Sequence, residues 1–137
     1  MADALLDTGV LVALLDRDER NHEVCVELFA GFRGRLLTTE PVLTEALHLL
    51  GPRHADQEPC LDFIVRGGAL LVPTTPEVLA RCRELMRRYR DTPMDFADAT
   101  LVALAELAGT VDVFTLDRRG FSTYRTRGRK AFRIFPQ

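Results

Sequence analysis

Ala4-Leu5-Leu6-Asp7-Thr8-Gly9-Val10-Leu11-Val12-Ala13-Leu14-Leu15 is where the architecture of this chain is set. Residues 4–7 have the apolar character of a short buried strand, and the apolar run 10–15 predicts a helix. The Thr8-Gly9 turn between them is too short to lead into a hairpin partner, so the stretch is a strand followed directly by a helix. Units of this kind build parallel sheets.

The rest of the chain repeats this alternation. The helix at 95–107 is apolar on almost every side, Pro41 suits the first turn of its helix, and Pro59 leaves the start of another helix open. Strands alternating with helices predict a three-layer α/β/α fold around a central, mainly parallel sheet of four to five strands. The further strands are expected at 36–38, 69–72, 111–116 and 131–135, and the helices at 21–32, 41–50, 55–65, 77–89 and 95–107.

The bulk properties fit one cytoplasmic domain spanning residues 1–137. A chain of this length buries roughly 68–70% of the surface that its unfolded form exposes. Its first apolar run is interrupted by Asp7 and is shorter than the ~20 residues that span a bilayer, so no membrane contact is expected. Cys25, Cys60 and Cys82 are odd in number and form no CxxC pair, which argues against disulfides, against a thiolate zinc site and for a reducing compartment.

Four acidic residues lie where apolar segments end or turn outward. Asp7 and Asp117 each follow a predicted strand, so they share one edge of the sheet if those strands are neighbours. Asp98 stands in the first turn of the apolar helix at 95–107, and Glu45 falls about 110° from the centre of its helix's apolar face. Each has an ordinary alternative, which is a helix cap for Asp7, a favourable charge at a helix start for Asp98, a turn for Asp117 and a solvated rim position for Glu45.

Joint placement of the four acids at one end of a sheet favours function. Close carboxylates repel one another unless a cation lies between them, and hard oxygen ligands select Mg²⁺, or Mn²⁺ in its place. His22, His48 and His54 lack the HxxxH spacing of a helical zinc site and are expected at the surface or at helix caps. Metal-dependent hydrolysis is therefore the hypothesis.

In order and spacing, four motifs of this chain resemble those of PIN-domain ribonucleases, and among these the toxins of VapBC-type toxin–antitoxin pairs. The motifs are Leu6-Asp7-Thr8-Gly9, Thr44-Glu45, Asp95-Phe96-Ala97-Asp98-Ala99 and Thr115-Leu116-Asp117-Arg118-Arg119-Gly120-Phe121. The resemblance implies cleavage of single-stranded RNA by metal-activated water.

The resemblance also implies roles for individual residues. Asp7, Asp98 and Asp117 would be the main Mg²⁺ ligands, and Glu45 would be a further ligand or the base that orients the water. Thr8 and Thr115 would support the pocket by hydrogen bonds, and Asp95 matches a frequently acidic position. Gly120 departs from relatives that carry an acid there.

Partners follow from the same resemblance. Toxins of this kind are kept inactive by a small antitoxin whose C-terminal segment lies in an apolar groove of the toxin. They commonly form homodimers. Val24, Leu28 and Phe29, with the helix at 43–50, are candidates for that groove, although such stripes more often belong to the core. A housekeeping RNA-processing nuclease without an antitoxin and a catalytically inactive RNA- or protein-binding scaffold remain alternatives. A phosphoacceptor receiver domain normally needs an adjacent acidic pair after its first strand and a lysine after its last strand. This chain fits that pattern badly, because Asp7-Thr8 is not an acidic pair and Lys130 is the only lysine.

The positive charge is concentrated near the C-terminus. Seven basic residues and no acid lie from Arg118 to Arg133, which leaves about −9 on the rest of the chain. This segment either binds the RNA backbone or is a solvated loop before the last strand. The arginines of the 77–89 helix are better explained as a solvated face. The candidate RNA-binding residues are Arg118, Arg119, Arg125, Arg127 and Arg129.

Overall fold

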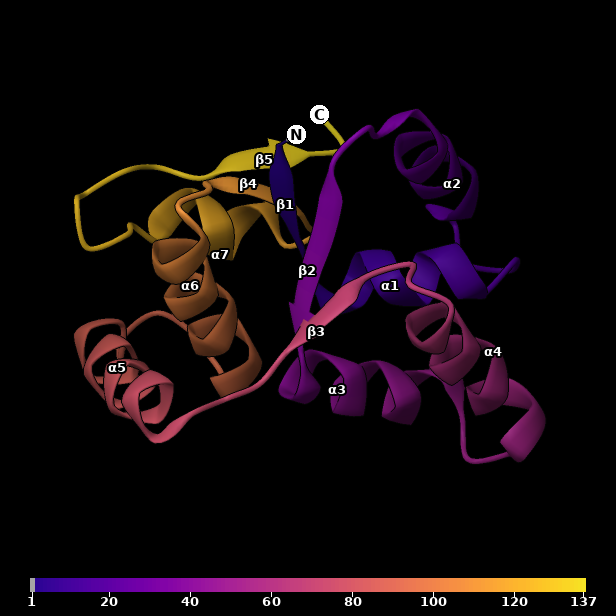
Figure 1. Ribbon diagram of the computed structural model, residues 1–137, viewed down its shortest axis with the longest axis horizontal. Helices are drawn as coiled ribbons and strands as arrows, with labels where there is room; N and C mark the ends of the chain where they lie inside the picture. The colour runs from indigo at the N-terminus through magenta and orange to yellow at the C-terminus, as the bar shows by residue number, and fades with distance from the viewer. Residues whose placement is uncertain (1) are drawn as a thin grey trace.

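The computed structural model describes residues 2–137, which form an α/β fold around a five-stranded parallel sheet. The strand order is β3-β2-β1-β4-β5, so β1 lies at the centre between β2 and β4 (Figure 1). Leu5 of β1 pairs with Leu37 of β2 on one side and with Val113 of β4 on the other. The predicted parallel sheet is confirmed at the upper end of its expected size. The strands are β1 (Asp3–Leu6), β2 (Arg35–Thr39), β3 (Leu70–Val72), β4 (Asp112–Phe114) and β5 (Arg133–Phe135).

Helices cover both faces of the sheet, which confirms the three-layer prediction. In Figure 1, α1, α2 and α4 lie on the right of the strands, α5, α6 and α7 lie on the left, and α3 starts beneath β2 and extends to the right. From β3 the chain passes through α5 and α6 to β4, and so from one side of β1 to the other. The helices are α1 (Thr8–Leu15), α2 (His22–Gly31), α3 (Glu40–Leu50), α4 (His54–Val65), α5 (Pro76–Arg88), α6 (Phe96–Ala108) and α7 (Arg118–Thr123).

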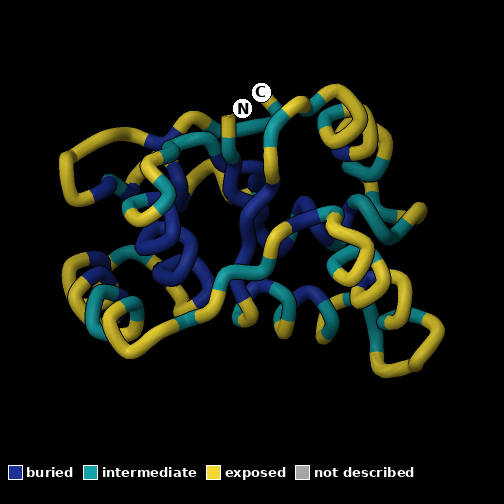
Figure 2. The backbone as a smooth tube through the Cα atoms, in the orientation of Figure 1, coloured by how far each residue is buried: buried dark blue, intermediate teal, exposed yellow. Residues whose placement is uncertain are grey.

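The core lies where the central strands meet α1 and α6 (Figure 2). α6 packs on α5 and α3 and on strands β1 and β2, so nearly its whole circumference is covered. This explains why its sequence is apolar all round. Asp98 is nevertheless part of its buried stretch. Within residues 2–137, no helix combines the length and apolar character needed to cross a bilayer.

Helix starts follow the local sequence. Pro41 lies in the first turn of α3, where a missing N–H costs no helical hydrogen bond. The Thr75 side chain accepts a 3.2 Å hydrogen bond from the Val78 N–H and caps α5. Pro59 proves to lie inside α4, which begins before it at His54.

The segment after β4 differs from the prediction. Residues 118–123 form α7, a six-residue helix, rather than part of a continuous loop. Phe121 and Tyr124 are fully buried, and their rings contact Phe132 and Tyr89 edge-on. The solvated-loop interpretation is therefore wrong for the first half of this basic segment. β4 and β5 are also shorter than the strands expected at 111–116 and 131–135.

Candidate active site

Asp7 and Asp117 meet beyond the carboxyl ends of β1 and β4. Asp7 caps α1 with Oδ1, which accepts a 2.8 Å hydrogen bond from the Thr8 N–H. Its other oxygen, Oδ2, accepts a 2.6 Å hydrogen bond from the Thr115 hydroxyl. The same hydroxyl accepts a 2.9 Å hydrogen bond from the Asp117 N–H. Because β1 and β4 are parallel neighbours, both acids lie at one edge of the sheet, as the strand-end argument predicts. One threonine joins them there.

Asp98 enters the site from the start of α6. It forms a capping box with Asp95: the Asp98 N–H donates to Asp95 Oδ1 at 2.8 Å, and the Asp95 N–H donates to Asp98 Oδ2 at 3.2 Å. The buried Tyr124 hydroxyl also donates to Asp98 Oδ2, at 3.1 Å. No residue from 2 to 137 donates a hydrogen bond to Asp98 Oδ1. The helix-cap explanation is thus correct for one oxygen and leaves the other available.

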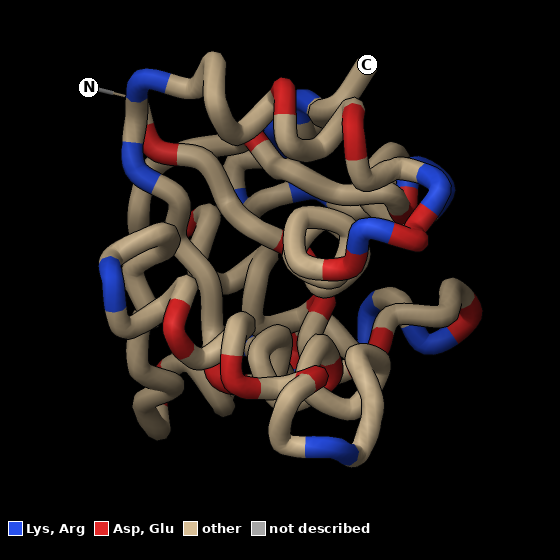
Figure 3. The backbone as a smooth tube through the Cα atoms, turned by 90° about the vertical axis from the view of Figure 1, so that its right-hand side faces the viewer, with Lys and Arg blue, Asp and Glu red and all other residues tan. Residues whose placement is uncertain are grey.

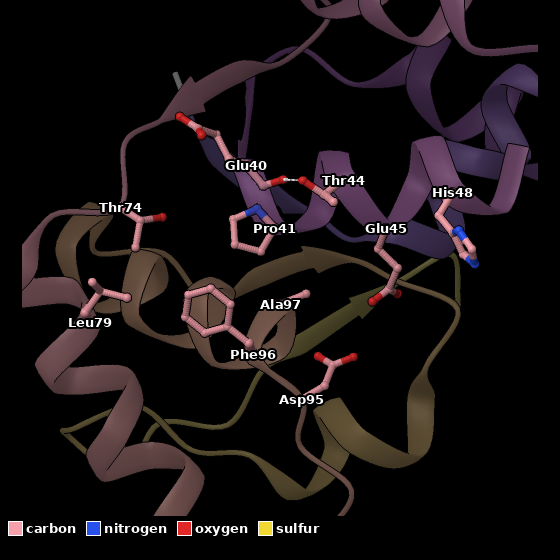
Figure 4. Close-up of a pocket in the computed structure, with 10 residues that line it drawn as sticks. All are labelled: Glu40, Pro41, Thr44, Glu45, His48, Thr74, Leu79, Asp95, Phe96 and Ala97. Atoms are coloured by element: carbon pink, nitrogen blue, oxygen red, sulfur yellow. Dashed lines mark hydrogen bonds between the residues drawn. The ribbon is translucent and has the colours of Figure 1, made fainter. Parts of the chain in front are cut away.

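Glu45 and Asp95 face each other across an open cavity of about 800 Å³ (Figure 4). Their carboxylates point toward one another from α3 and from the residue that precedes α6. Burial and the negative charge of Asp95 raise the pKa of Glu45. Glu45 is half-buried, which confirms its rim position. The cavity is lined by Glu40, Pro41, Thr44, Glu45, His48, Thr74, Leu79, Asp95, Phe96 and Ala97.

The acids form one electrostatic cluster. Burial raises the pKa of Asp7 to about 6 against the hydrogen bonds from Thr115 and Thr8, and the charges of Asp117 and Glu45 raise it too. Burial likewise raises the pKa of Asp98 to about 7, with added repulsion from Asp95 and Asp7. Carboxylates that raise one another's pKa by charge repulsion lie close together, within about one Debye length. The acids do serve as helix caps and turn residues, but they also lie close enough to one another to interact electrostatically.

The residues suit a hard divalent cation by their chemistry. They offer carboxylate oxygens whose repulsion a cation relieves. The Thr8 hydroxyl adds a buried oxygen with no hydrogen-bond partner of good geometry in the described chain, although it lies close enough to Glu45 to favour that carboxylate's charged form. Among residues 2–137, however, no three Asp, Glu, His or Cys side chains already converge as a ligand set. The oxygens surround a common region without closing on one point.

Comparison with known families decides the relationship. The family model described as "PIN domain" matches residues 4–126, a span that includes all four acids. The chain belongs to the PIN-domain family.

Curated and solved relatives agree with this assignment. The PIN domain described here is 29% identical to Ribonuclease VapC26 of Mycobacterium tuberculosis over 134 residues, covering 96% of this chain and 99% of that protein. Its fold is similar to the crystal structure of M. tuberculosis VapC20, a "Sarcin-Ricin loop cleaving toxin", with a TM-score of 0.75, 20% identity, and coverage of 82% and 87% of the two chains. It is also similar to VapBC2 from Rickettsia felis, solved with a promoter DNA fragment, with a TM-score of 0.69, 13% identity, and coverage of 98% and 99%.

Two features of this PIN domain's site escaped sequence reasoning. Tyr124 contacts Asp98, and Gly120 donates its N–H to Asp117 Oδ1 at 3.1 Å. Tyr124 follows Asp117 by seven residues, a spacing that places both on one face of a helix. A predicted helix after β4 would have pointed to it.

The candidate RNA-binding arginines differ in how free they are. Arg118 donates to the Pro136 carbonyl at 2.9 Å, and Arg125 donates to the carbonyls of Ser122 and Tyr124. Arg127 and Arg129 are exposed and make no ion pair within the described residues. By contrast, the face formed by α1 to α4 mixes charges of both signs (Figure 3).

The histidines lie mainly at the periphery. His54 is exposed and pairs with Glu58 at 2.7 Å, and His48 is exposed at the edge of the cavity. His22 is half-buried, with Nδ1 2.6 Å from the Ala13 carbonyl oxygen, so it joins α2 to α1.

Proposed function

We propose that this PIN domain is a metal-dependent endoribonuclease that cleaves single-stranded RNA and acts as the toxin of a VapBC-type pair. The observation that carries the proposal is the hydrogen-bonded junction of Asp7, Thr115 and Asp117 at the ends of two neighbouring strands. Asp98 and Glu45 repel Asp7 electrostatically from the other two walls of the same region. This is the donor set that phosphodiester hydrolysis with a divalent cation needs.

The comparisons support the reaction class. The relative named Ribonuclease VapC26 aligns over nearly the full length of both chains, so the likeness includes every residue of the candidate site. The solved neighbours named as VapC or VapBC proteins support the toxin assignment through their shared fold.

Each acid has a distinct task in this proposal. Asp7, Asp98 and Asp117 would hold the cation, Asp7 and Asp98 from buried positions and Asp117 from an exposed one. A bound Mg²⁺ or Mn²⁺ would polarise the scissile phosphate and lower the pKa of the attacking water. Glu45 lies at the open rim, and its raised pKa makes its carboxylate a stronger base toward that water. Asp95 supports the site by capping α6 and so fixing the position of Asp98.

Substrate binding falls to the exposed basic residues. An acidic site repels the RNA backbone, so binding needs the cation and positive charge beside it. Arg127 and Arg129 have guanidinium groups free of ion pairs in the described chain, and Arg118 and Arg119 begin the helix that Asp117 caps. We therefore propose that the RNA backbone binds on the side of the molecule that carries these arginines.

An antitoxin and a second copy of the chain are the proposed protein partners. α2 exposes Val24, Val26 and Phe29, and Leu49 of α3 is 58% exposed. These exposed apolar side chains are the candidate contacts for such a partner. The expectation that Leu28 belongs to the same groove is weaker, because it packs against the core.

Two experiments test the proposal together. The first incubates the purified chain with a single-stranded RNA and with the same sequence as a duplex, in Mg²⁺, in EDTA, and in EDTA followed by excess Mg²⁺. Cleavage of the single strand that EDTA stops and Mg²⁺ restores is the expected result, whereas a lack of cleavage in Mg²⁺ and Mn²⁺ would indicate a binding scaffold. The second purifies the chain from its native host and identifies bound proteins, and active protein with no small partner would indicate a processing nuclease.

A further inference from the structure

Tyr124 follows α7 directly, and its hydroxyl donates a 3.1 Å hydrogen bond to Asp98 Oδ2. Its side chain is fully buried, and its ring contacts Tyr89 and Phe121 edge-on, with centroids 5.2 Å apart in both cases. Aromatic contacts on two sides leave the ring little freedom to turn away. The hydroxyl is therefore held at one place beside Asp98.

The Tyr124 hydroxyl constrains how Asp98 presents its carboxylate. A tyrosine phenol is protonated at neutral pH, so it donates to Asp98 Oδ2. The N–H of Asp95, three residues before Asp98, donates to the same oxygen. Two donors on Oδ2 fix the plane of the carboxylate and leave Oδ1 without a protein donor in the described residues. Tyr124 thus selects which oxygen of Asp98 stays available.

Gly120 makes room for this arrangement. A Cβ placed on Gly120 would collide with Asp117 Oδ2 and would lie 3.1 Å from the Tyr124 hydroxyl. The backbone of Gly120 does not need glycine, because its φ is not positive. What needs glycine is the space in which the Asp117 carboxylate and the Tyr124 hydroxyl lie side by side. Gly120 also donates its N–H to Asp117 Oδ1 at 3.1 Å.

We propose that Tyr124 is a positioning residue that orients Asp98 through its hydroxyl, and that Gly120 is its matching partner, which keeps Asp117 and Tyr124 in place. The inference rests on the proposed function, because its activity readout needs the ribonuclease and its Mn²⁺ readout needs the proposed cation site. It gives the glycine at position 120 a role of its own: the space that a side chain would fill there is occupied by the two oxygens that the site uses.

The test compares Tyr124→Phe with Tyr89→Phe in the full chain. Both variants lose one phenol hydroxyl of the same aromatic cluster, but the Tyr89 hydroxyl accepts a hydrogen bond from the Arg125 N–H and forms none with an acid of residues 2–137. Readouts are kcat and KM for single-stranded RNA and, separately, Mn²⁺ affinity by calorimetry without RNA. Because loss of an outer hydrogen bond to a ligand commonly costs 10–100-fold, Tyr124→Phe is expected to lower kcat and Mn²⁺ affinity by about tenfold each. KM should change less than about twofold, and Tyr89→Phe should stay within about twofold of wild type in both readouts.

Gly120→Ala provides an independent variant, with Gly31→Ala as its matched control. Gly31 is also helical, and a Cβ there would meet nothing within 4 Å. Gly120→Ala is expected to lose activity and Mn²⁺ affinity, because the added Cβ would displace the Asp117 carboxylate and crowd the Tyr124 hydroxyl, whereas Gly31→Ala is expected to change neither readout. Indistinguishable behaviour within each pair, in both readouts, would overturn the inference. If wild type does not cut RNA but the Mn²⁺ affinities differ as stated, the proposed function fails and the positioning role stands.

Discussion

The Thr115 hydroxyl lies 2.6 Å from Asp7 Oδ2, and this hydrogen bond ties the end of β4 to the end of β1. The bond spans 108 positions of sequence and lies in the buried part of the site. Since the same hydroxyl accepts a hydrogen bond from the Asp117 N–H, the geometry of both acids depends on one oxygen atom. Removing that atom therefore affects both stability and activity.

Thr115→Val keeps the side-chain volume and removes the hydroxyl. Asp7 then loses a donor and the Asp117 N–H loses its acceptor, so the free energy of unfolding should fall by about 1–3 kcal/mol. Chemical denaturation at pH 7 measures the change, and RNA cleavage should fall with it. Thr115→Ser keeps the hydroxyl and is the control. Equal stability of the valine and serine variants would contradict the role of this hydrogen bond.

The pH dependence of stability follows from the raised pKa values of Asp7 and Asp98. Their native pKa values of about 6 and about 7 lie above the ordinary value of 3.8. Between about pH 4 and pH 7 the native state therefore holds protons that the unfolded state has released, and stability falls as pH rises. The thermal midpoint in EDTA should be higher at pH 5 than at pH 8.

Asp98→Asn is the control for this pH effect, because it removes one of the two groups. Its profile from pH 5 to pH 8 should be flatter, and at pH 8 it should be more stable than wild type. The ion-paired Asp3 and Asp56, whose pKa values are lowered by Arg35 and Arg53, act below this window. A wild-type midpoint that rises steadily from pH 5 to pH 8 in EDTA would contradict the assignment.

Asp95 separates a structural role from a charge role. Asp95→Ala loses the side-chain acceptor of the Asp98 N–H and should cost about 1 kcal/mol of unfolding free energy. Asp95→Asn keeps an acceptor and should remain close to wild type. Both variants remove the same charge beside Glu45 and Asp98, so the difference between them, measured by denaturation, isolates the cap. Matching losses in the two variants would show that the cap contributes nothing.

Arg127→Ala combined with Arg129→Ala tests the basic surface. If each arginine contacts one phosphate, the slope of log K against log[salt] should decrease by about 0.7 per arginine for single-stranded RNA. Filter binding at several salt concentrations, with the catalytically disabled protein, measures the slope. Arg66→Ala is the control, because Arg66 is paired with Asp62 on α4. An unchanged slope in the double variant would assign these arginines to a solvated turn.

Much of the architecture was predictable because the buried strands are apolar in sequence. The apolar segments before Asp7 and Asp117 are the central strands β1 and β4, and parallel neighbours bring their carboxyl ends together. The apolar circumference of α6 indicated correctly that Asp98 is buried. These conclusions depend on periodicity and on topology, both of which a single sequence carries.

The missing parts depend on side-chain contacts between distant segments. α7 is only six residues long and contains Gly120, so its helical signal is weak, and it is held by Phe121 and Tyr124 in the core. The Thr115 bond to Asp7 and the Tyr124 bond to Asp98 depend on rotamers that no spacing rule specifies. Glu45 was placed at the rim correctly, but its proximity to Asp95 follows only from how α3 packs on α6.

Cleavage of single-stranded RNA by Asp98→Asn, compared with wild type and with Asp62→Asn in saturating Mg²⁺, tests most directly whether the four acids act as one catalytic site. Asp62 is a half-exposed acid on α4, so its substitution changes the net charge equally and leaves the site intact. Asp98→Asn should cut at least about a hundredfold more slowly than both, because it loses a charged group beside the reacting phosphate. Equal rates for all three proteins would contradict the account.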